Sequence, residues 1–298
     1  MVPRTGGERV PVTAGRARGS GGRFPASLAT PVLLAFAVFI VAPCIMLLVK
    51  GLEPTAETGE WPDFTNVLGV FDSKVGQQAL NRTIRISLIV TVICLLAGYP
   101  VALFIARCGP RWRGLLLAVV IFPFLISAVV RAFGWTVLLG DSGLANKGLI
   151  ALGLIDRPIA LVQNEIGIIV GETHLLMPYM ILSLLAVLQR IDPNLKHAAE
   201  SLGASPVSVF WRIVIPLTLP GLLTGTLLVF SLAMTAFATP FLLGGGRTPI
   251  LTTLLYDYAF TLFDWRLAAS IGIVLLILGI LFVTVHRFVS SRGMRSYG

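Results

Sequence analysis

Residues 86–106 of the chain read ISLIVTVICLLAGYPVALFIA, a run without a single charged side chain. At about 1.5 Å of rise per residue, a helix of this length is roughly 30 Å long, which is the thickness of the hydrocarbon layer of a membrane. Lipid offers no hydrogen bonds to the backbone, so a segment that crosses it must be helical. We therefore interpret residues 86–106 as a transmembrane helix.

Further apolar runs of similar length lie on both sides of this one. They are residues 31–49, 114–139, 166–188, 217–237 and 267–288. Pro43, Pro123 and Pro178 fall inside three of the runs, where we expect kinks whose freed carbonyls are covered by neighbouring helices. The pattern predicts an all-α, polytopic membrane protein with six transmembrane helices in one domain, residues 28–298. Residues 1–27 are rich in Gly, Pro and Arg, and they predict a disordered basic tail.

The composition agrees with a membrane protein and argues against a nucleic-acid-binding one. The 298 residues carry a net charge of +9, which alone would suit a nucleic-acid partner. However, 56% of the residues are hydrophobic and only 12% are charged, about half the usual charged share of a globular protein. Because long stretches contain no charge at all, we expect lipid around the chain and exclude nucleic acid as a partner.

The basic residues separate by side of the membrane once six spans are laid out. The side that holds both termini carries 14 Lys and Arg against three acidic residues, and the opposite loops carry eight against ten. The 14 are Arg4, Arg9, Arg16, Arg18, Arg23, Arg107, Arg111, Arg113, Arg190, Lys196, Arg212, Arg287, Arg292 and Arg295. Basic residues accumulate in cytoplasmic loops, so we expect both termini in the cytoplasm.

The cytoplasmic loop between the fourth and fifth spans, residues 190–212, contains signals for two short helices. Asp-Pro at 192–193 and Ser-Pro at 205–206 each combine a capping residue with a proline at the first helical position. Gly203 between them suits a left-handed turn. Two short helices at a sharp turn would form a rigid projection for a partner to grip. We refer to residues 190–212 as the docking segment.

The docking segment resembles the EAA loop of ABC importer permeases, whose pattern is Glu-Ala-Ala, three residues, Gly, nine residues and Ile-x-Leu-Pro. The residues in register here are His197, Ala198, Ala199, Gly203, Ile213, Ile215 and Pro216. In that family the loop is the coupling helix seated in a cleft of the cytoplasmic ATPase, and its Glu helps to anchor the contact. His197 stands where the family has Glu, and Glu200, one turn along, could take that role.

Other segments, residues 125–135, 143–146, 154–156 and 240–257, resemble permeases of the spermidine/putrescine type. The resemblance implies a type I ABC importer permease of the bacterial cytoplasmic membrane, which carries polyamines or another small solute. It also implies three kinds of partner: a second permease, identical or homologous, two cytoplasmic ATPase subunits, and an extracytoplasmic solute-binding protein. ATP and Mg²⁺ would bind to the ATPase, so no cofactor is expected on this chain.

Two charged residues lie inside the expected spans, Arg131 in the third and Glu172 in the fourth. Both would lie roughly 9–12 Å below the external surface at 1.5 Å per residue, where a charge is costly unless it is paired or faces water. Three interpretations remain open: a structural ion pair, a contact with the solute or a gate in the pathway, and an Arg131 side chain that reaches outward. His174 is expected to pack or hydrogen-bond rather than to bind a ligand.

Motifs for catalysis are absent from this sequence. It contains no Gly-x-x-x-x-Gly-Lys-Ser/Thr phosphate loop, no His/Glu metal motif and no Gly-x-Ser-x-Gly elbow. We therefore expect a transport subunit rather than an enzyme. Two other functions stay open: a secondary transporter driven by an ion gradient, and a membrane scaffold that uses the docking segment. The slight acidity of the external loops, which include Asp257 and Asp264, is compatible with a cationic solute.

Overall fold

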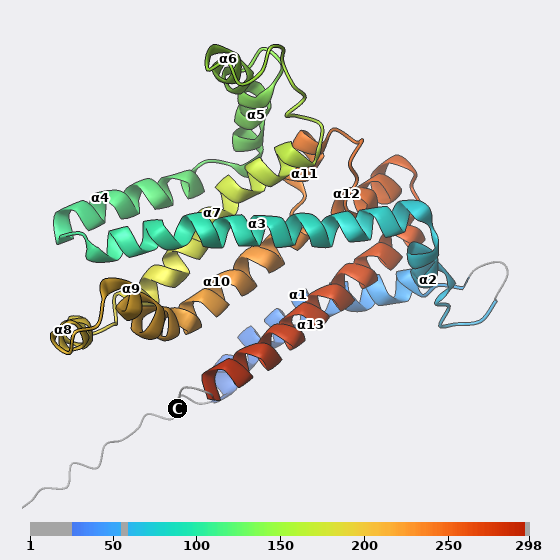
Figure 1. Ribbon diagram of the computed structural model, residues 1–298. Helices are drawn as coiled ribbons and strands as arrows, with labels where there is room; N and C mark the ends of the chain where they lie inside the picture. Colours follow the sequence, from blue (N-terminus) through green and yellow to red (C-terminus); the bar gives the residue numbers. More distant parts are fainter. Residues whose placement is uncertain (1–25, 55–58, 296–298) are drawn as a thin grey trace, which may run out of the picture. The chain divides into compact units, whose positions relative to one another are not determined.

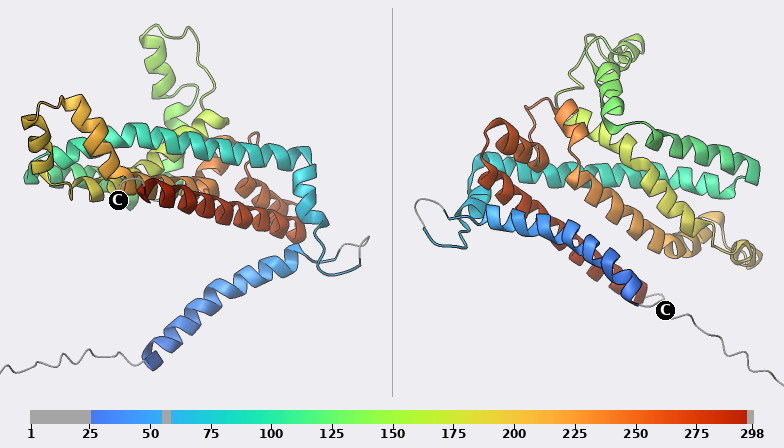
Figure 2. Two further views of the ribbon diagram at one scale, coloured as in Figure 1. Left: turned by 60° about the horizontal axis from the view of Figure 1, so that its bottom comes forward. Right: turned by 180° about the vertical axis from the view of Figure 1, so that it is seen from behind.

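The computed structural model describes residues 26–54 and 59–295, so nearly all of the expected tail at 1–27 lies outside the described residues. The chain divides into two units, Met1–Ile45 and Met46–Gly298, and each is described by itself. All regular structure in the described ranges is helical (Figures 1 and 2). The all-α prediction is therefore confirmed.

The helices are named in chain order, and η marks a 3₁₀ or π segment. They are α1 (Ala26–Gly51), α2 (Thr65–Asp72), α3 (Lys74–Arg107), α4 (Pro110–Ile121), η1 (Phe122–Leu125), α5 (Ala128–Leu139), α6 (Leu144–Ala151), α7 (Glu165–Leu188), α8 (Pro193–Ser201), α9 (Pro206–Val209), η2 (Phe210–Val214), α10 (Ile215–Thr235), α11 (Ala238–Gly244), α12 (Leu251–Tyr256), η3 (Asp257–Thr261) and α13 (Trp265–Arg295).

Five helices among the described residues are long and apolar enough to cross a membrane. They are Leu34–Gly51 within α1, Lys74–Arg107, Glu165–Leu188, Pro206–Thr235 and Trp265–Phe288. Each overlaps one of the runs expected from the sequence. The fifth run starts earlier than expected, at Pro206, because α9, η2 and α10 continue into one another as one helix.

The expected third span, residues 114–139, is not one helix. The two arms of this region, Pro110–Leu125 and Ala128–Ala151, are bent by 97° and count as a sixth span only if they are taken together. Pro123 removes a backbone donor in the middle of the run, and Ile126 and Ser127 then adopt extended backbone with ψ of 131° and 137°. The run is therefore bent beside Pro123, where a kink was expected, but it is broken into two helices rather than kinked within one.

The core of the second unit is a group of three long helices, α3, α7 and α10, which lie against one another (Figure 1). Val90 and Ala102 of α3, Met180 and Leu184 of α7, and Val229 of α10 are all completely buried. A second apolar cluster joins α2, α12 and α13 to the first turns of α3. From this core, α5 and α6 project to one side (Figures 1 and 2).

Two glycines allow α10 to approach α7 closely. A Cβ atom on Gly225 would lie 2.6 Å from Sδ of Met180, and one on Gly221 would lie 2.9 Å from the carbonyl oxygen of Ser183. Gly221 and Gly225 are four residues apart, so both lie on one face of the helix. Small residues at this spacing are a common way for membrane helices to pack backbone against backbone.

Polar contacts tie the ends of the core helices together. Near one end, the Tyr99 hydroxyl of α3 lies 3.0 Å from the Thr218 hydroxyl of α10. At the other, Nε of Arg82 donates to Glu165 at 2.9 Å, and Arg85 also pairs with Glu165. Arg82 in addition donates to the carbonyl of Pro249 at 3.0 Å. The first turn of α7 is thus fixed to α3 by ion pairs.

The packing predicts that Gly221→Leu lowers stability, since a leucine cannot fit between α10 and α7 without moving one of them. We expect a loss of about 1–3 kcal/mol, measured as a lower thermal unfolding midpoint of the detergent-solubilised chain. The matched control is Gly114→Leu on α4, because a Cβ there meets nothing within 4 Å. Equal midpoints for the two variants would contradict the close helix contact.

Candidate functional site

The docking segment folds into the two short helices that the sequence predicts. Backbone N–H of Asn194 donates to the Asp192 carboxylate at 2.9 Å before α8, and N–H of Ser208 donates to the Ser205 hydroxyl at 3.3 Å before α9. Gly203 between the helices has φ +82°, a conformation that glycine adopts freely and β-branched residues rarely adopt. The cap signals and the turn signal are therefore both confirmed.

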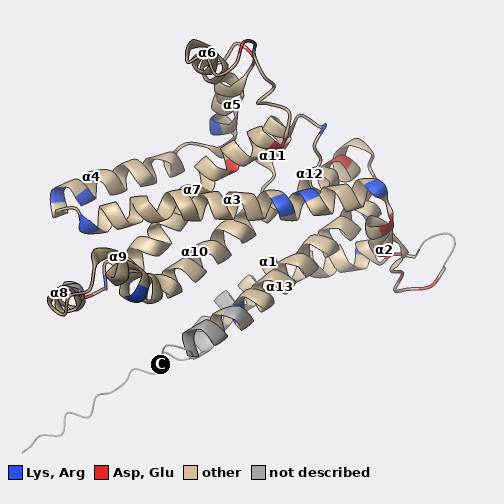
Figure 3. Cartoon of the chain, viewed as in Figure 1, with Lys and Arg blue, Asp and Glu red and all other residues tan. Residues whose placement is uncertain are grey.

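The docking segment lies at the end of the core where α7 ends and α10 begins (Figure 1). Lys and Arg also gather at this end, at the turn from α3 to α4 and close to α9 (Figure 3). They include Arg107 in the last turn of α3 and Arg111 and Arg113 in the first turns of α4. Three of the basic residues that the sequence assigns to one side of the membrane are thus neighbours at this end of the core.

Several large apolar side chains of the docking segment face solvent. Leu202 is 88% exposed and Trp211 is 63% exposed, and Val207 is also exposed. Large apolar side chains that cluster on an exposed, polar-flanked loop typically mark a surface that a partner covers. Ala198 is exposed and Ala199 is half-buried, whereas the side chains of His197 and Glu200, both within α8, lie outside the described part of the structure.

A groove of about 370 Å³ runs beside these exposed side chains. Its lining consists of Leu195, Arg212, Ile213, Pro216 and Leu217. The structure therefore brings Ile213 and Pro216, which the sequence could only place in register, next to Leu195 of α8. The groove is mostly apolar with one basic residue, which suits a partner surface with an apolar knob and a carboxylate.

Arg131 and Glu172 come from α5 and α7 and face the same region without forming an ion pair. The ion pairs found among the described residues join Lys50 to Glu53 and Arg82 and Arg85 to Glu165. Arg131 donates from Nη2 to the carbonyl of Ile126 at 3.2 Å, while its Nε and Nη1 are buried without a partner. Of the three interpretations, the direct ion pair is absent from this conformation.

Glu172 is 1% exposed, and neither carboxylate oxygen has a hydrogen-bond partner among the described residues. The Thr239 side chain of α11 lies beside the carboxylate and the Arg131 guanidinium acts on it through charge, but neither meets the full geometry of a hydrogen bond. An ion without a partner in this environment costs several kcal/mol. Such a group is rare in a membrane domain and is a functional-site candidate.

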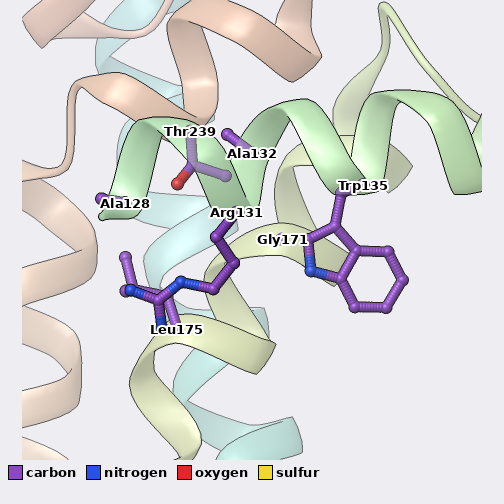
Figure 4. A pocket seen from close by; sticks show the side chains of 7 residues that line it. All are labelled: Ala128, Arg131, Ala132, Trp135, Gly171, Leu175 and Thr239. Carbon is purple, nitrogen blue, oxygen red and sulfur yellow. The ribbon is translucent and has the colours of Figure 1, made fainter. Parts of the chain in front are cut away.

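A narrow crevice without room for a water molecule lies beside Glu172, where α5, α7 and α11 meet. Its lining consists of Ala128, Arg131, Ala132, Trp135, Gly171, Leu175 and Thr239 (Figure 4). The Arg131 side chain extends from α5 towards Leu175 of α7 (Figure 4). Trp135 is held in place by its indole N–H, which donates to Nδ1 of His174 at 3.3 Å. His174 therefore hydrogen-bonds, as expected.

Thr239 and Gly171 could not be assigned to this site from the sequence. Thr239 lies in α11, a short helix in a region without a span of its own, and it reaches the site only through the fold. Gly171 permits that approach, since a Cβ there would lie 2.6 Å from Cγ2 of Thr239 and 2.5 Å from Cδ1 of Leu243. The one available signal was a glycine directly before a charged residue within an apolar helix.

Comparison with known proteins identifies relatives over most of the chain. Residues 98–295 match the family described as binding-protein-dependent transport system inner membrane component. The spermidine/putrescine transport system permease protein PotB of Haemophilus influenzae is 35% identical over 221 residues, which cover 74% of this chain and 77% of that protein. The Escherichia coli PotB is 34% identical over 211 residues, 70% of this chain and 77% of that protein.

More distant relatives carry other descriptions. The molybdenum transport system permease protein ModB of Mycobacterium tuberculosis is 26% identical over 251 residues, 84% of this chain and 89% of that protein. Among solved structures, a chain of a bacterial alginate ABC transporter in complex with an alginate pentasaccharide-bound periplasmic protein matches with a TM-score of 0.76. It is 20% identical and covers 90% of this chain and 93% of that one, a likeness of fold.

Because Glu172 has no partner, we expect that replacing its carboxylate by a neutral amide stabilises the protein. Glu172→Gln should raise the free energy of unfolding by roughly 1–2 kcal/mol, because it removes a buried charge that has no partner. The measurement is a higher thermal unfolding midpoint of the detergent-solubilised chain. The matched control on the same helix is Glu165→Gln, which removes a carboxylate that Arg82 and Arg85 do contact and should lower the midpoint. A direct pair with Arg131 would instead make Glu172→Gln destabilising, by roughly 3–5 kcal/mol.

Proposed function

The chain belongs to the family of binding-protein-dependent transport system inner membrane components, and from this premise we propose the part that it plays in an ATP-driven importer. It is one of two permease subunits, identical or homologous, that together enclose the solute pathway across the cytoplasmic membrane. An extracytoplasmic binding protein delivers the solute, and two cytoplasmic ATPase subunits drive the cycle. The chain itself holds no cofactor, because ATP and Mg²⁺ bind to the ATPase subunits.

The exposed docking segment is the observation that carries this proposal. Its two capped helices present Leu202, Val207 and Trp211 to solvent beside the groove that contains Ile213 and Pro216. Apolar side chains on a short, rigid, polar-flanked loop favour a stable partner rather than free solvent. The ATPase subunit is the partner that fits, because its movement on binding ATP must be passed to the membrane helices through a contact of this kind.

The orientation of the chain follows from its basic residues. Arg107, Arg111 and Arg113 lie at the same end of the core as the docking segment (Figure 3). A membrane favours this arrangement when that end faces the cytoplasm. Both termini then lie in the cytoplasm, and Glu165 with its two arginine partners lies at the external end.

The solute that we propose is a polyamine such as spermidine or putrescine. Permeases described as spermidine/putrescine transporters are 34–35% identical to this chain, well above the 26% of the molybdenum permease. At the external end, Phe237, Phe241, Tyr256 and Phe260 form a series of ring contacts with centroid separations of 5.0–5.3 Å. Aromatic faces attract ammonium groups, and Asp257 directly follows Tyr256. Asp264, by contrast, caps α13 through the N–H of Leu267 at 3.0 Å.

Reconstitution into proteoliposomes tests the proposed function. The chain is assembled with its second permease, ATPase and binding protein. Uptake of radiolabelled spermidine is followed without ATP and with ATP on the side of the membrane that the ATPase faces. We expect uptake only when ATP, ATPase and binding protein are all present. Uptake without the ATPase would point to the alternative of an ion-gradient-driven transporter, and ATP-dependent uptake of a different solute would replace the polyamine assignment.

The left-handed turn at Gly203 generates a coupling prediction. Gly203→Val should reduce spermidine uptake per ATP hydrolysed at least about fivefold, because a β-branched residue at φ +82° would distort the docking segment by an energy of order 1–2 kcal/mol per residue. A Cβ at this position meets no other atom of the chain within 4 Å. Within the chain, the strain therefore comes from the backbone.

The matched control for that prediction is Gly203→Asn, since asparagine tolerates the left-handed conformation. It should keep uptake and hydrolysis coupled as in the unaltered chain. Both variants should insert into the membrane equally. Identical coupling ratios for the Val and Asn variants would refute a role for this turn.

A further inference from the structure

Glu172 is a buried acidic residue without a hydrogen-bond partner. The residue is 1% exposed, and both carboxylate oxygens are unpaired among the described residues. The neighbouring Arg131 leaves Nε and Nη1 unpaired as well rather than closing the gap. A fold that only needed a structural ion pair would bring these two groups into contact, because both charges pay a desolvation cost while they remain apart.

Two short helices cover Glu172. α5 and α11 pack against each other and against α7, and we refer to them together as the cover. Each of these helices is bounded by non-helical backbone. Ile126 and Ser127 are extended before α5, Ala236 is extended before α11 with ψ of 137°, and Gly245 has φ +60° after α11. The cover is therefore joined to the long helices through residues that can change dihedral angle without breaking a helix.

The cover lies close against α7, because Gly171 has no Cβ atom to hold α11 away. The crevice beside Glu172 is too narrow for a water molecule in this conformation. A solute can therefore reach the carboxylate only after the cover moves. Trp135, fixed by His174, supplies an aromatic wall, and Thr239 supplies a hydroxyl beside the carboxylate.

We propose that Glu172 is a cation-binding residue of the solute pathway, covered by α5 and α11 in this conformation and exposed when the cover moves during the transport cycle. The solute class is a primary or secondary alkylamine in its ammonium form. The ammonium group of the solute pairs with the Glu172 carboxylate. The movement of α5 carries the Arg131 guanidinium, which would repel the solute, away from Glu172. This inference rests on the proposed function, because it requires a cycle in which the pathway opens.

Kinetics of spermidine uptake by the reconstituted importer test the binding role. Glu172→Gln should raise KM for spermidine at least about tenfold, since it replaces a charge-assisted hydrogen bond by a neutral one. Glu172→Asp, which keeps the charge, should restore part of the loss. The control Glu53→Gln should leave KM unchanged, because Glu53 is an exposed residue paired only with exposed Lys50. Size-exclusion chromatography checks that each variant assembles into the complex.

A thiol-labelling experiment tests whether the cover opens. Cys44, Cys94 and Cys108 are first replaced by Ala, and Glu172→Cys is introduced into the assembled importer. A membrane-impermeant, cationic methanethiosulfonate reagent should label it at least about tenfold faster during ATP turnover with the binding protein than at rest. The matched control is Leu184→Cys on the same helix, which is fully buried in the three-helix core and should stay unlabelled in both conditions.

The outcomes separate the inference from the function on which it rests. Spermidine uptake by the unaltered importer with the same KM in Glu172→Gln would overturn the inference and leave the polyamine function standing. A Glu172→Cys thiol that stays unlabelled during turnover would also overturn it. Failure of the unaltered importer to take up spermidine would overturn the polyamine assignment first, and the inference with it.

Discussion

A lipid bilayer supplies no hydrogen bonds, and this constraint shapes every part of the chain that it surrounds. Long apolar stretches have to close their backbone hydrogen bonds internally, which they do as α3, α7, α10 and α13. Once helical, these stretches cannot associate through the hydrophobic effect, because lipid is as apolar as they are. Close contact through small residues such as Gly221 and Gly225 then becomes the means of holding the core together.

The same constraint makes polar groups within the core informative. The ion pairs at the first turn of α7 satisfy Glu165 fully, and Tyr99 finds Thr218. Glu172, on the same helix as Glu165, is left unsatisfied. Among the described residues, Glu172 is the buried carboxylate with neither oxygen hydrogen-bonded, and the neighbouring Arg131 also keeps buried unpaired nitrogens. Buried groups left unsatisfied at a cost in stability are expected where a residue is selected for binding.

Most of the architecture could be predicted from the sequence, because span length and charge are local properties. The apolar runs, the two capped helices of the docking segment and the turn at Gly203 all follow from residues close in sequence. The direction of a helix after a break is not local. Pro123 predicts a kink, but the 97° bend depends on how α5 packs against α7 and α11. The surroundings of Glu172 and Arg131 could not be predicted for the same reason, since Thr239 lies on a short helix that no hydropathy pattern marks.

One helix runs without interruption from the docking segment to the cover. Residues Pro206–Thr235 form a single helix of roughly 45 Å at 1.5 Å per residue, with α8 attached before it and α11 directly after it. The π segment Phe210–Val214 and the prolines at 216 and 220 lie in its cytoplasmic half, and regular helix follows from there to Thr235. On the proposed function, a push by the ATPase at the cytoplasmic end would displace Thr235 at the far end, and with it the Ala236 joint that leads into α11. The moment at which Glu172 meets solute would then be set by the ATPase rather than by the solute.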